Sequence, residues 1–446
     1  MAESAATQAT QAAPMTHARV LRIAVPIVLS NSTVPLLGVV DTAVVGQMGA
    51  AVPIGAVGIG AIVLSSLYWL FAFLRMGTIG LASQAKGAGD TAEEHAILSR
   101  CLMIGLAGGA LLIVVQLPLF AAAFWMSPAS AEVESLARDY MAIRIWSAPA
   151  LIALYGVTGW LIAEERTGAV LAQQLVMNGL NIALNIWFVI GLNWGVTGVA
   201  WATFIAEWAG LLIGLWFCRG VFAAPHWRDK VKVFARAPLM RMALINRDIM
   251  LRSFLIQVIF VSFLFFSGDL GDVTLAANQV LMQFVFVTSY ALDGFAHAVE
   301  TLVGQAIGQK DRARLRQAAI LGCIWAVLVA VALSIAFAVT GVSIIAIMAT
   351  SQEVRAVAGA YLVYVALTPV CAVWSFMIDG IFVGATRARD MRDTMAISAV
   401  IYLILTGLLL PSFGNHGLWL ALVISFLVRA VTLGMRYPDL EKTAVS

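Results

Sequence analysis

The sequence predicts an all-α membrane protein with twelve transmembrane helices in two parallel sets of six. Of its 446 residues, 61% are apolar and 11% are charged, whereas soluble globular chains carry about 25% charged residues. The mean hydropathy is +0.93, and the apolar residues lie in runs long enough to cross a bilayer. An internal repeat divides these runs into two equal sets. These observations exclude a water-soluble fold.

Twelve segments have the length of about 20 apolar residues that a helix needs to span the hydrocarbon core. In chain order they cover residues 20–46, 53–82, 97–125, 138–163, 168–191, 196–218, 246–267, 273–304, 318–346, 357–384, 394–411 and 416–435. None of these runs shows the alternating pattern of a β-barrel strand, so helices must satisfy the backbone hydrogen bonds in lipid.

The distribution of Lys and Arg predicts the orientation of the spans. Basic residues concentrate in the connections after even-numbered spans, for example over 310–316 and 387–392. The opposite connections carry few, with Arg138 and Arg355 at their edges. Because basic connections stay on the cytoplasmic side, we expect both termini in the cytoplasm and a multi-pass protein of a bacterial-type inner (plasma) membrane.

The internal repeat predicts the domain organisation. Leu81–Asp90 (LASQAKGAGD) and Leu302–Asp311 (LVGQAIGQKD) share five of ten residues at an offset of 221, and Arg166 and Arg387 fit the same offset. An even number of spans in each copy makes the repeats parallel, with substrate expected between them. The predicted parts are a cytoplasmic tail (1–18), a first lobe (19–218), a basic cytoplasmic linker (219–245), a second lobe (246–436) and a cytoplasmic tail (437–446).

Several classes of chemistry have no motif in this sequence. It contains no phosphate-binding loop, no zinc-protease motif and no nucleophile elbow, and its four cysteines form no metal-binding pair. We therefore predict no catalytic residue, no metal site and no cofactor. A net charge of +3 with scattered basic residues argues against nucleic-acid binding. A transporter driven by an ion gradient is favoured, and a membrane-embedded enzyme is the alternative from another class.

One acidic and three neutral polar residues predict a cation pocket in the first lobe. Asp41 lies in the first span, where an ionised side chain costs about 2.5–3.5 kcal/mol. Asn181 and Asn185 share one face of the fifth span, and Thr203 lies in the outer half of the sixth. These oxygen donors can hold either a proton on Asp41 or Na⁺, and interhelical hydrogen bonding is the structural alternative for the two asparagines.

A second group of polar residues lies in the other lobe. Asp293, His297 and Glu300 follow one another at i, i+4 and i+7, on one helical face. Asp379, in the tenth span, lies near the inner end. We interpret the three residues of the eighth span as a relay or gate, with a structural polar seam as the equal alternative. Asp379 completes this secondary polar stripe, and because it lies near the inner end, helix packing or loop anchoring is its favoured interpretation.

Two further side chains of the eighth span, Met282 and Phe286, are candidates for lining a cavity for lipophilic cations. Methionine adapts its shape to its neighbours, and aromatic faces attract cations.

Five motifs resemble the DinF branch of the multidrug and toxic compound extrusion (MATE) transporters, and the resemblance covers about residues 16–436. They are Asp41–Gly49 (DTAVVGQMG), Phe73–Leu81 (FLRMGTIGL), Asn246–Asp248 (NRD), Asp293–Glu300 (DGFAHAVE) and Asp379–Arg387 (DGIFVGATR). It implies two six-helix lobes around a V-shaped cavity, and exchange of H⁺ or Na⁺ for organic cations or amphipathic compounds.

The resemblance also implies roles for single residues. In related transporters, the positions of Asp41, Asn181, Asn185 and Thr203 form the cation pocket of the first lobe. Some relatives have an aspartate in place of Asn185, so a single carboxylate here favours protons over Na⁺. The sodium site that the NorM branch forms with an acid of the seventh helix is not carried over, because 253–267 contains no acid.

The sequence therefore predicts a secondary antiporter that exports cationic or amphipathic small molecules, such as drugs and toxic metabolites, in exchange for H⁺. Asp41 is the predicted protonation site. A Na⁺-coupled version and a lipid-linked precursor flippase of the same superfamily are the alternatives. The expected partners are the small-molecule substrate and the lipid bilayer, with no nucleic acid and with the chain as a monomer.

Overall fold

The computed structural model describes residues 14–47, 51–126 and 130–443, and it describes only the backbone of residues 34–39, 41, 42, 51, 126, 226 and 443. All regular structure in these parts is helical. The first half of the chain forms α2 (His17–Gly46), α3 (Ala51–Trp69), α4 (Phe73–Gly87), α5 (Thr91–Val114), α6 (Gln116–Met126), α7 (Ala131–Arg144), η1 (Ile145–Ser147), α8 (Ala148–Ala163), α9 (Thr167–Asn185), the π-helical η2 (Ile186–Gly191) and α10 (Gly195–Phe217).

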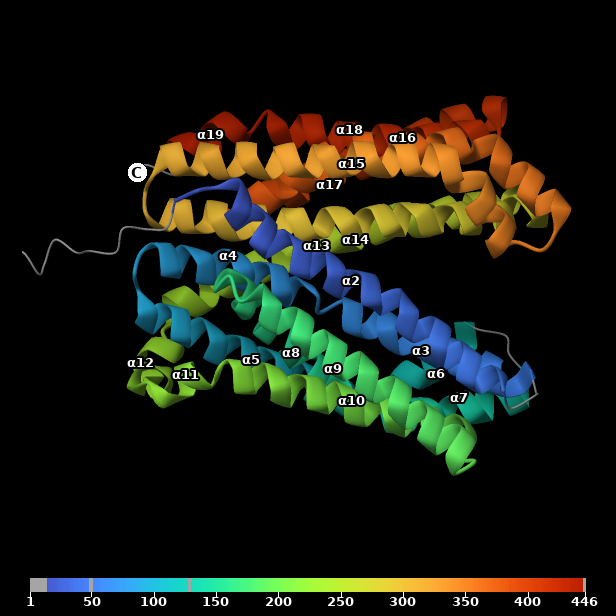
Figure 1. Ribbon diagram of the computed structural model, residues 1–446, viewed down its shortest axis with the longest axis horizontal. Helices are drawn as coiled ribbons and strands as arrows, with labels where there is room; N and C mark the ends of the chain where they lie inside the picture. Colours follow the sequence, from blue (N-terminus) through green and yellow to red (C-terminus); the bar gives the residue numbers. More distant parts are fainter. Residues whose placement is uncertain (1–13, 48–50, 127–129, 444–446) are drawn as a thin grey trace, which may run out of the picture.

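The connection and the second half follow with longer helices. They are α11 (Arg219–Ala223), η3 (Pro225–Arg228), α12 (Lys230–Val233), α13 (Arg236–Asp269), α14 (Asp272–Gly308), α15 (Arg312–Met348), α16 (Gln352–Gly384), α17 (Ala388–Phe413), α18 (Asn415–Gly434) and α19 (Tyr437–Thr443). Figure 1 shows the first-half helices (blue to green) grouped on one side and most second-half helices (yellow to red) on the other. Helices α2 and α4 pack against α14 where the two groups meet.

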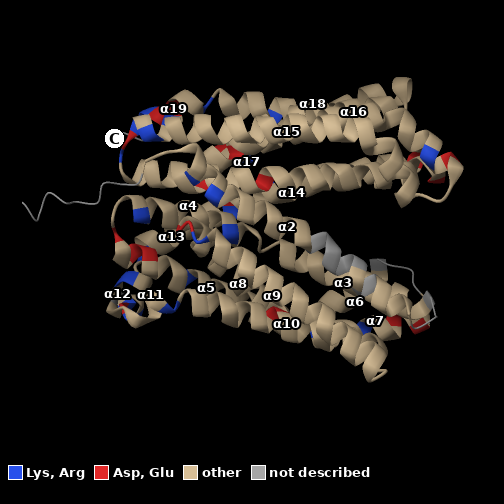
Figure 2. Ribbon diagram, viewed as in Figure 1, with Lys and Arg blue, Asp and Glu red and all other residues tan. Residues whose placement is uncertain are grey.

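Eleven helical segments among the described residues are long and apolar enough to cross a membrane. Helix α2, which is 30 residues long, is not one of the eleven, so this count does not establish the predicted twelve. The predicted spans 53–82 and 97–125 are each divided, into α3 with α4 and α5 with α6. Charged residues gather at the end of the molecule that carries α12 and α19 (Figure 2).

The predicted repeat is confirmed in local backbone structure. Asp90 and Asp311, which are equivalent in the repeat, each cap the following helix by accepting a hydrogen bond from the backbone N–H three residues on. Glu165 and Thr386, also equivalent, both have a positive φ, of 59° and 56°. The connections that follow α4, α8, α14 and α16 are therefore built in the same way in both halves.

The long basic connection is more ordered than the predicted linker over 219–245. Helix α13 begins at Arg236, inside that range. Pro238 lies in the first turn of the helix, where a missing backbone N–H costs nothing. The buried guanidinium of Arg100 on α5 donates to the carbonyl oxygens of Lys232 (2.5 Å) and Val233 (2.9 Å), so the connection is fastened to the first-half helices.

Candidate functional site

A cavity of about 320 Å³ lies between the two helix groups. Its lining comes from α3 and α4 on one side and from α13, α14, α16 and α18 on the other. Seven of its lining residues are arginines, carboxylates or a histidine: Arg75, Arg252, Asp293, His297, Glu300, Asp379 and Arg429. The four residues of the predicted polar stripe therefore all lie on one cavity, which is the location between the repeats that the sequence predicts for substrate.

Asp379 is held by two arginines from other helices. Arg252 of α13 and Arg429 of α18 both form ion pairs with its carboxylate, and all three side chains are buried. Two guanidinium groups on one carboxylate compensate much of the cost of burying these charges. The three residues therefore connect α13, α16 and α18 at the cavity wall.

The remaining stripe residues lie along α14. His297 Nδ1 is 2.8 Å from Glu300 Oε2, and both side chains are buried. The side chain of Asp293 is partly buried and forms no hydrogen bond or ion pair with a residue that the structure describes. The stripe thus contains one internal pair and one carboxylate that lines the cavity without a hydrogen-bond partner among the described residues.

The two apolar candidates separate. Phe286 lines the cavity and lies 6.2 Å from Phe260, centroid to centroid. Met282, one turn earlier on α14, does not line the cavity and is buried in the apolar core of the second-half helices.

The predicted polar residues of the first lobe form a buried hydrogen-bonded chain. Asn185 Nδ2 donates to Asn181 Oδ1 (2.8 Å), and Asn181 Nδ2 donates to Thr203 Oγ1 (3.0 Å). Thr203 Oγ1 in turn donates to the carbonyl oxygen of Val199 (3.0 Å). All three predicted residues are buried. The chain joins α9 to α10.

A separate contact joins α9 to the helix that carries Asp41. Asn178, on the same side of α9, donates from Nδ2 to Thr33 Oγ1 of α2 at 2.9 Å. Asp41 lies in α2, but its side chain falls outside the described residues, so its distance to Asn181 and Asn185 stays a prediction. Asn178 and Thr33 were not predicted, although the spacing of Gln174, Asn178, Asn181 and Asn185 forms a polar helical stripe.

Two matching contacts hold the helix groups together at the end that carries α12 and α19. In one, Gln305 Nε2 donates to Glu165 Oε1 (3.0 Å) and to the carbonyl of Ala163 (3.3 Å), while Arg19 donates to Gln305 Oε1 (2.7 Å) and pairs with Glu165 (2.5 Å). We call Arg19, Glu165 and Gln305 the first latch.

The repeat-equivalent contact is the second latch, formed by Arg241, Gln84 and Thr386. Gln84 Nε2 donates to Thr386 Oγ1 (3.3 Å) and to the carbonyl of Gly384 (2.9 Å), and Arg241 donates to Gln84 Oε1 (2.8 Å) and Thr386 Oγ1 (3.1 Å). Glutamines Gln84 and Gln305 are equivalent in the repeat, so the two latches are related by its pseudo-twofold symmetry.

The backbones approach so closely at the latches that side chains are excluded. A Cβ added at Gly87 would overlap backbone atoms of Gln305, and one added at Gly308 would overlap those of Gln84. Ser83 is fully buried in the same seam, beside Gly304. This end of the molecule is therefore closed in the structure.

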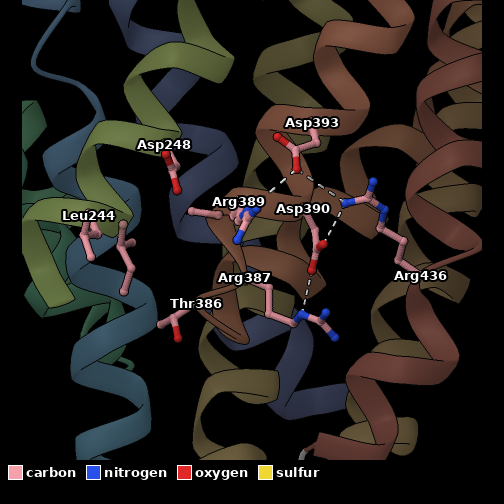
Figure 3. A pocket seen from close by; sticks show the side chains of 10 residues that line it. Leu244, Asp248, Thr386, Arg387, Arg389, Asp390, Asp393 and Arg436 are labelled. Atoms are coloured by element: carbon pink, nitrogen blue, oxygen red, sulfur yellow. Dashed lines mark hydrogen bonds and ion pairs between the residues drawn. The ribbon is translucent and has the colours of Figure 1, made fainter.

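A second cavity, of about 520 Å³, lies beside the connection from α16 to α17. Its carboxylates are all paired with arginines: Asp390 lies 2.6 Å from Arg387 and 2.7 Å from Arg436, and Asp393 pairs with Arg389 and Arg436 at 4.0 Å (Figure 3). Asp248, which also lines the cavity, pairs with Arg392 at 2.8 Å. Because these groups neutralise one another, we assign this cavity a structural role at the closed end.

The comparisons with known proteins agree with this geometry. The MatE family model matches residues 26–187 and 249–408. The chain is 40% identical to DNA damage-inducible protein F of Escherichia coli, over 92% of this chain and 90% of the relative. It is 24% identical to the probable multidrug resistance protein NorM of Pasteurella multocida, over 95% and 94% of the two chains.

Solved structures show the same fold. A MATE crystal structure in the bent conformation matches with a TM-score of 0.87 at 19% identity, over 96% of this chain and 97% of that chain. A MOP superfamily transporter from Pyrococcus furiosus, described as having a binding pocket of reversed polarity, matches with a TM-score of 0.79 at 18% identity, over 96% of each chain. The chain therefore belongs to the MatE family of multidrug and toxic compound extrusion transporters, and it is a transporter rather than an enzyme.

Proposed function

We propose that the chain is an antiporter that exports cationic or amphipathic small molecules in exchange for H⁺, with Asp41 as the protonation site. The observation that carries the proposal is the buried chain Asn185–Asn181–Thr203, together with the separate contact of Asn178, on the same helix, with Thr33 of α2, the helix of Asp41. Its described members are all neutral amides and hydroxyls, so a single proton on Asp41 changes the charge of the whole cluster. Protonation then alters how α2 packs on α9.

The latches support alternating access as the mechanism. Both latches join the first helix group to the second at one end, and the charged residues there fit the cytoplasmic side by the positive-inside rule. We infer that the structure has its cytoplasmic end closed, that both termini are cytoplasmic, and that the latches separate when the transporter opens inward. The chain acts as a monomer in the inner membrane.

The experiment is transport by purified protein in proteoliposomes, with pH and Na⁺ gradients imposed separately and a panel of cationic dyes as substrates. A pH gradient alone should drive wild-type export, and Asp41→Asn should abolish it while the protein still inserts and folds. Asp139→Asn, at an exposed position of α7, serves as the matched control and should keep wild-type rates. Transport that follows the Na⁺ gradient alone would replace H⁺ with Na⁺ as the coupling ion.

The lipid-linked precursor flippase is the second candidate, and one observation favours it: three arginines line the central cavity. Two of them, Arg252 and Arg429, are engaged by Asp379, which leaves less positive charge for a pyrophosphate. Movement of a fluorescent lipid pyrophosphate across the proteoliposome membrane, at a rate that exceeds dye export, would establish this function instead.

A further inference from the structure

The central cavity contains opposite charges, most of which are already paired within the protein. Asp379 binds Arg252 and Arg429, and His297 binds Glu300. Five of the seven arginines, carboxylates and histidine that line the cavity are therefore engaged with one another. They stabilise the wall of the cavity, and their charges are largely compensated before any ligand enters.

The two remaining charged lining residues, Arg75 and Asp293, have opposite charges. Neither side chain forms a hydrogen bond or an ion pair with a residue that the structure describes, although Asp293 interacts electrostatically with His297, Arg75 and Arg252. The Nε of Arg75 is buried and has no hydrogen-bond partner among the described residues. A charged donor left in this state costs more than an ordinary lost hydrogen bond, so Arg75 has a favourable interaction still to make.

Arg75 and Asp293 also lie on different helix groups. Arg75 is on α4 of the first half, and Asp293 is on α14 of the second. Between them the cavity is lined by large apolar side chains from both groups, among them Trp69, Phe260 and Phe286. A ligand that touches both charges must therefore carry two charged groups and an apolar body, and it must bridge the two groups of helices.

We propose that the central cavity is a binding site for zwitterionic amphipaths. The ligand's ammonium group pairs with Asp293, its carboxylate or phosphate pairs with Arg75, and its aromatic or aliphatic body lies against Phe260 and Phe286. The proposal rests on the proposed export function and specifies its substrate class. A simple cation would leave Arg75 unpaired, and a simple anion would leave Asp293 unpaired, so each should bind more weakly than the zwitterion.

A matched series of fluorescent ligands tests this directly. Nα-dansyl-lysine carries both charges, dansylcadaverine is the same molecule without its carboxylate, and Nα-dansyl-norleucine has the carboxylate without the amine. Binding to purified full-length protein in detergent is measured by dansyl fluorescence, without any ion gradient. We expect Nα-dansyl-lysine to bind about tenfold or more tightly than either of the others, since it makes one more charged hydrogen bond than each of them.

Variants assign each charge to its residue. Arg75→Gln should weaken the binding of Nα-dansyl-lysine about tenfold and leave the affinity for dansylcadaverine unchanged, whereas Arg75→Lys should restore the preference for the zwitterion. Asp293→Asn should weaken the binding of the two amines and leave the affinity for Nα-dansyl-norleucine unchanged. Arg138→Gln removes an exposed arginine of α7 and should alter none of the three affinities.

The ligand series separates this proposal from misfolding and from the export function. Equal affinities of wild-type protein for Nα-dansyl-lysine and dansylcadaverine would overturn the proposal, as would an Arg75→Gln variant that loses all three ligands to the same extent while Arg75→Lys does not recover them. If the binding pattern holds and neither amine is exported in proteoliposomes, then the export function fails and the binding site stands.

Discussion

Removing the side chain of Gln305 should shift the transporter toward its inward-open state. The side chain makes three hydrogen bonds in the first latch, two of them to the charged groups of Glu165 and Arg19. A hydrogen bond to a charged group contributes about 1.5–3 kcal/mol and a neutral one about 0.5–1.5 kcal/mol. Because the direct pair Arg19–Glu165 remains, we expect Gln305→Ala to destabilise the closed state by about 2 kcal/mol relative to the open state. This corresponds to about a 30-fold increase in the ratio of open to closed molecules.

The assay uses a cysteine placed in the closed seam. Ser83 is fully buried between the helix groups, so Ser83→Cys reacts with a water-soluble maleimide only when that end opens. The partly exposed Cys323 and Cys371 are replaced by serine, and the protein without Ser83→Cys gives the background. Gln305→Ala should raise the labelling rate of Ser83→Cys by about the same 30-fold factor.

Two comparisons make the outcome decisive. Gln84→Ala, in the second latch, should raise labelling less, because Gln84 contacts one charged side chain, Arg241, where Gln305 contacts two. Gln279→Ala, at an exposed position near the start of α14, should not raise it. An unchanged rate for Gln305→Ala, or an equal increase for Gln279→Ala, would refute the assignment of the latches to the closed state.

Three further predictions concern single interactions. Asp379→Asn leaves two buried arginines without their anion and should lower the free energy of unfolding by about 3–5 kcal/mol, which is measured as a lower unfolding temperature in detergent. Asp439→Asn, at an exposed position, should leave the unfolding temperature unchanged. Burial alone would raise the pKa of Glu165, but the hydrogen bonds and charge of Arg19 lower it below its ordinary 4.5. The ionised Glu165 therefore stabilises the first latch at pH values above 4.5, and this contribution is lost only as the pH falls through the lowered pKa. The labelling rate of Ser83→Cys, normalised to a surface cysteine, should therefore stay constant between neutral and mildly acidic pH. Thr203→Val removes the acceptor of a buried hydrogen bond and should lower the free energy of unfolding by about 1–3 kcal/mol. An unfolding temperature equal to that of wild-type protein would contradict this prediction.

The helical fold and the repeat could be predicted because both depend on local patterns. Long apolar runs give the spans, and the shared residues of Leu81–Asp90 and Leu302–Asp311 correspond to equivalent helix caps in the structure. The break after Trp69 could not be predicted, because its turn contains no proline or glycine and lies in a run that is uniformly apolar. The break between α5 and α6 did have a signal, since Gln116 and Pro118 follow it directly.

The sequence allowed the polar stripe to be predicted, but it did not indicate which residues pair with its members. Asp293, His297, Glu300 and Asp379 could be placed by depth and helical face, but pairing between distant helices leaves no mark in local spacing. Arg429 is the example: it stands alone in an apolar run, and only the packing of α18 on α16 brings it to Asp379. A solitary arginine in a span was the signal available.

The most direct test of the proposed coupling counts the protons exchanged when substrate binds. Purified transporter in lightly buffered detergent solution is mixed with a cationic dye, and a pH indicator records proton release. If Asp41 holds the exchanged proton, wild-type protein should release about one proton per dye bound at a pH low enough for Asp41 to be protonated before the dye is added. Asp41→Asn should bind the dye and release none. Equal release by both proteins would contradict the account.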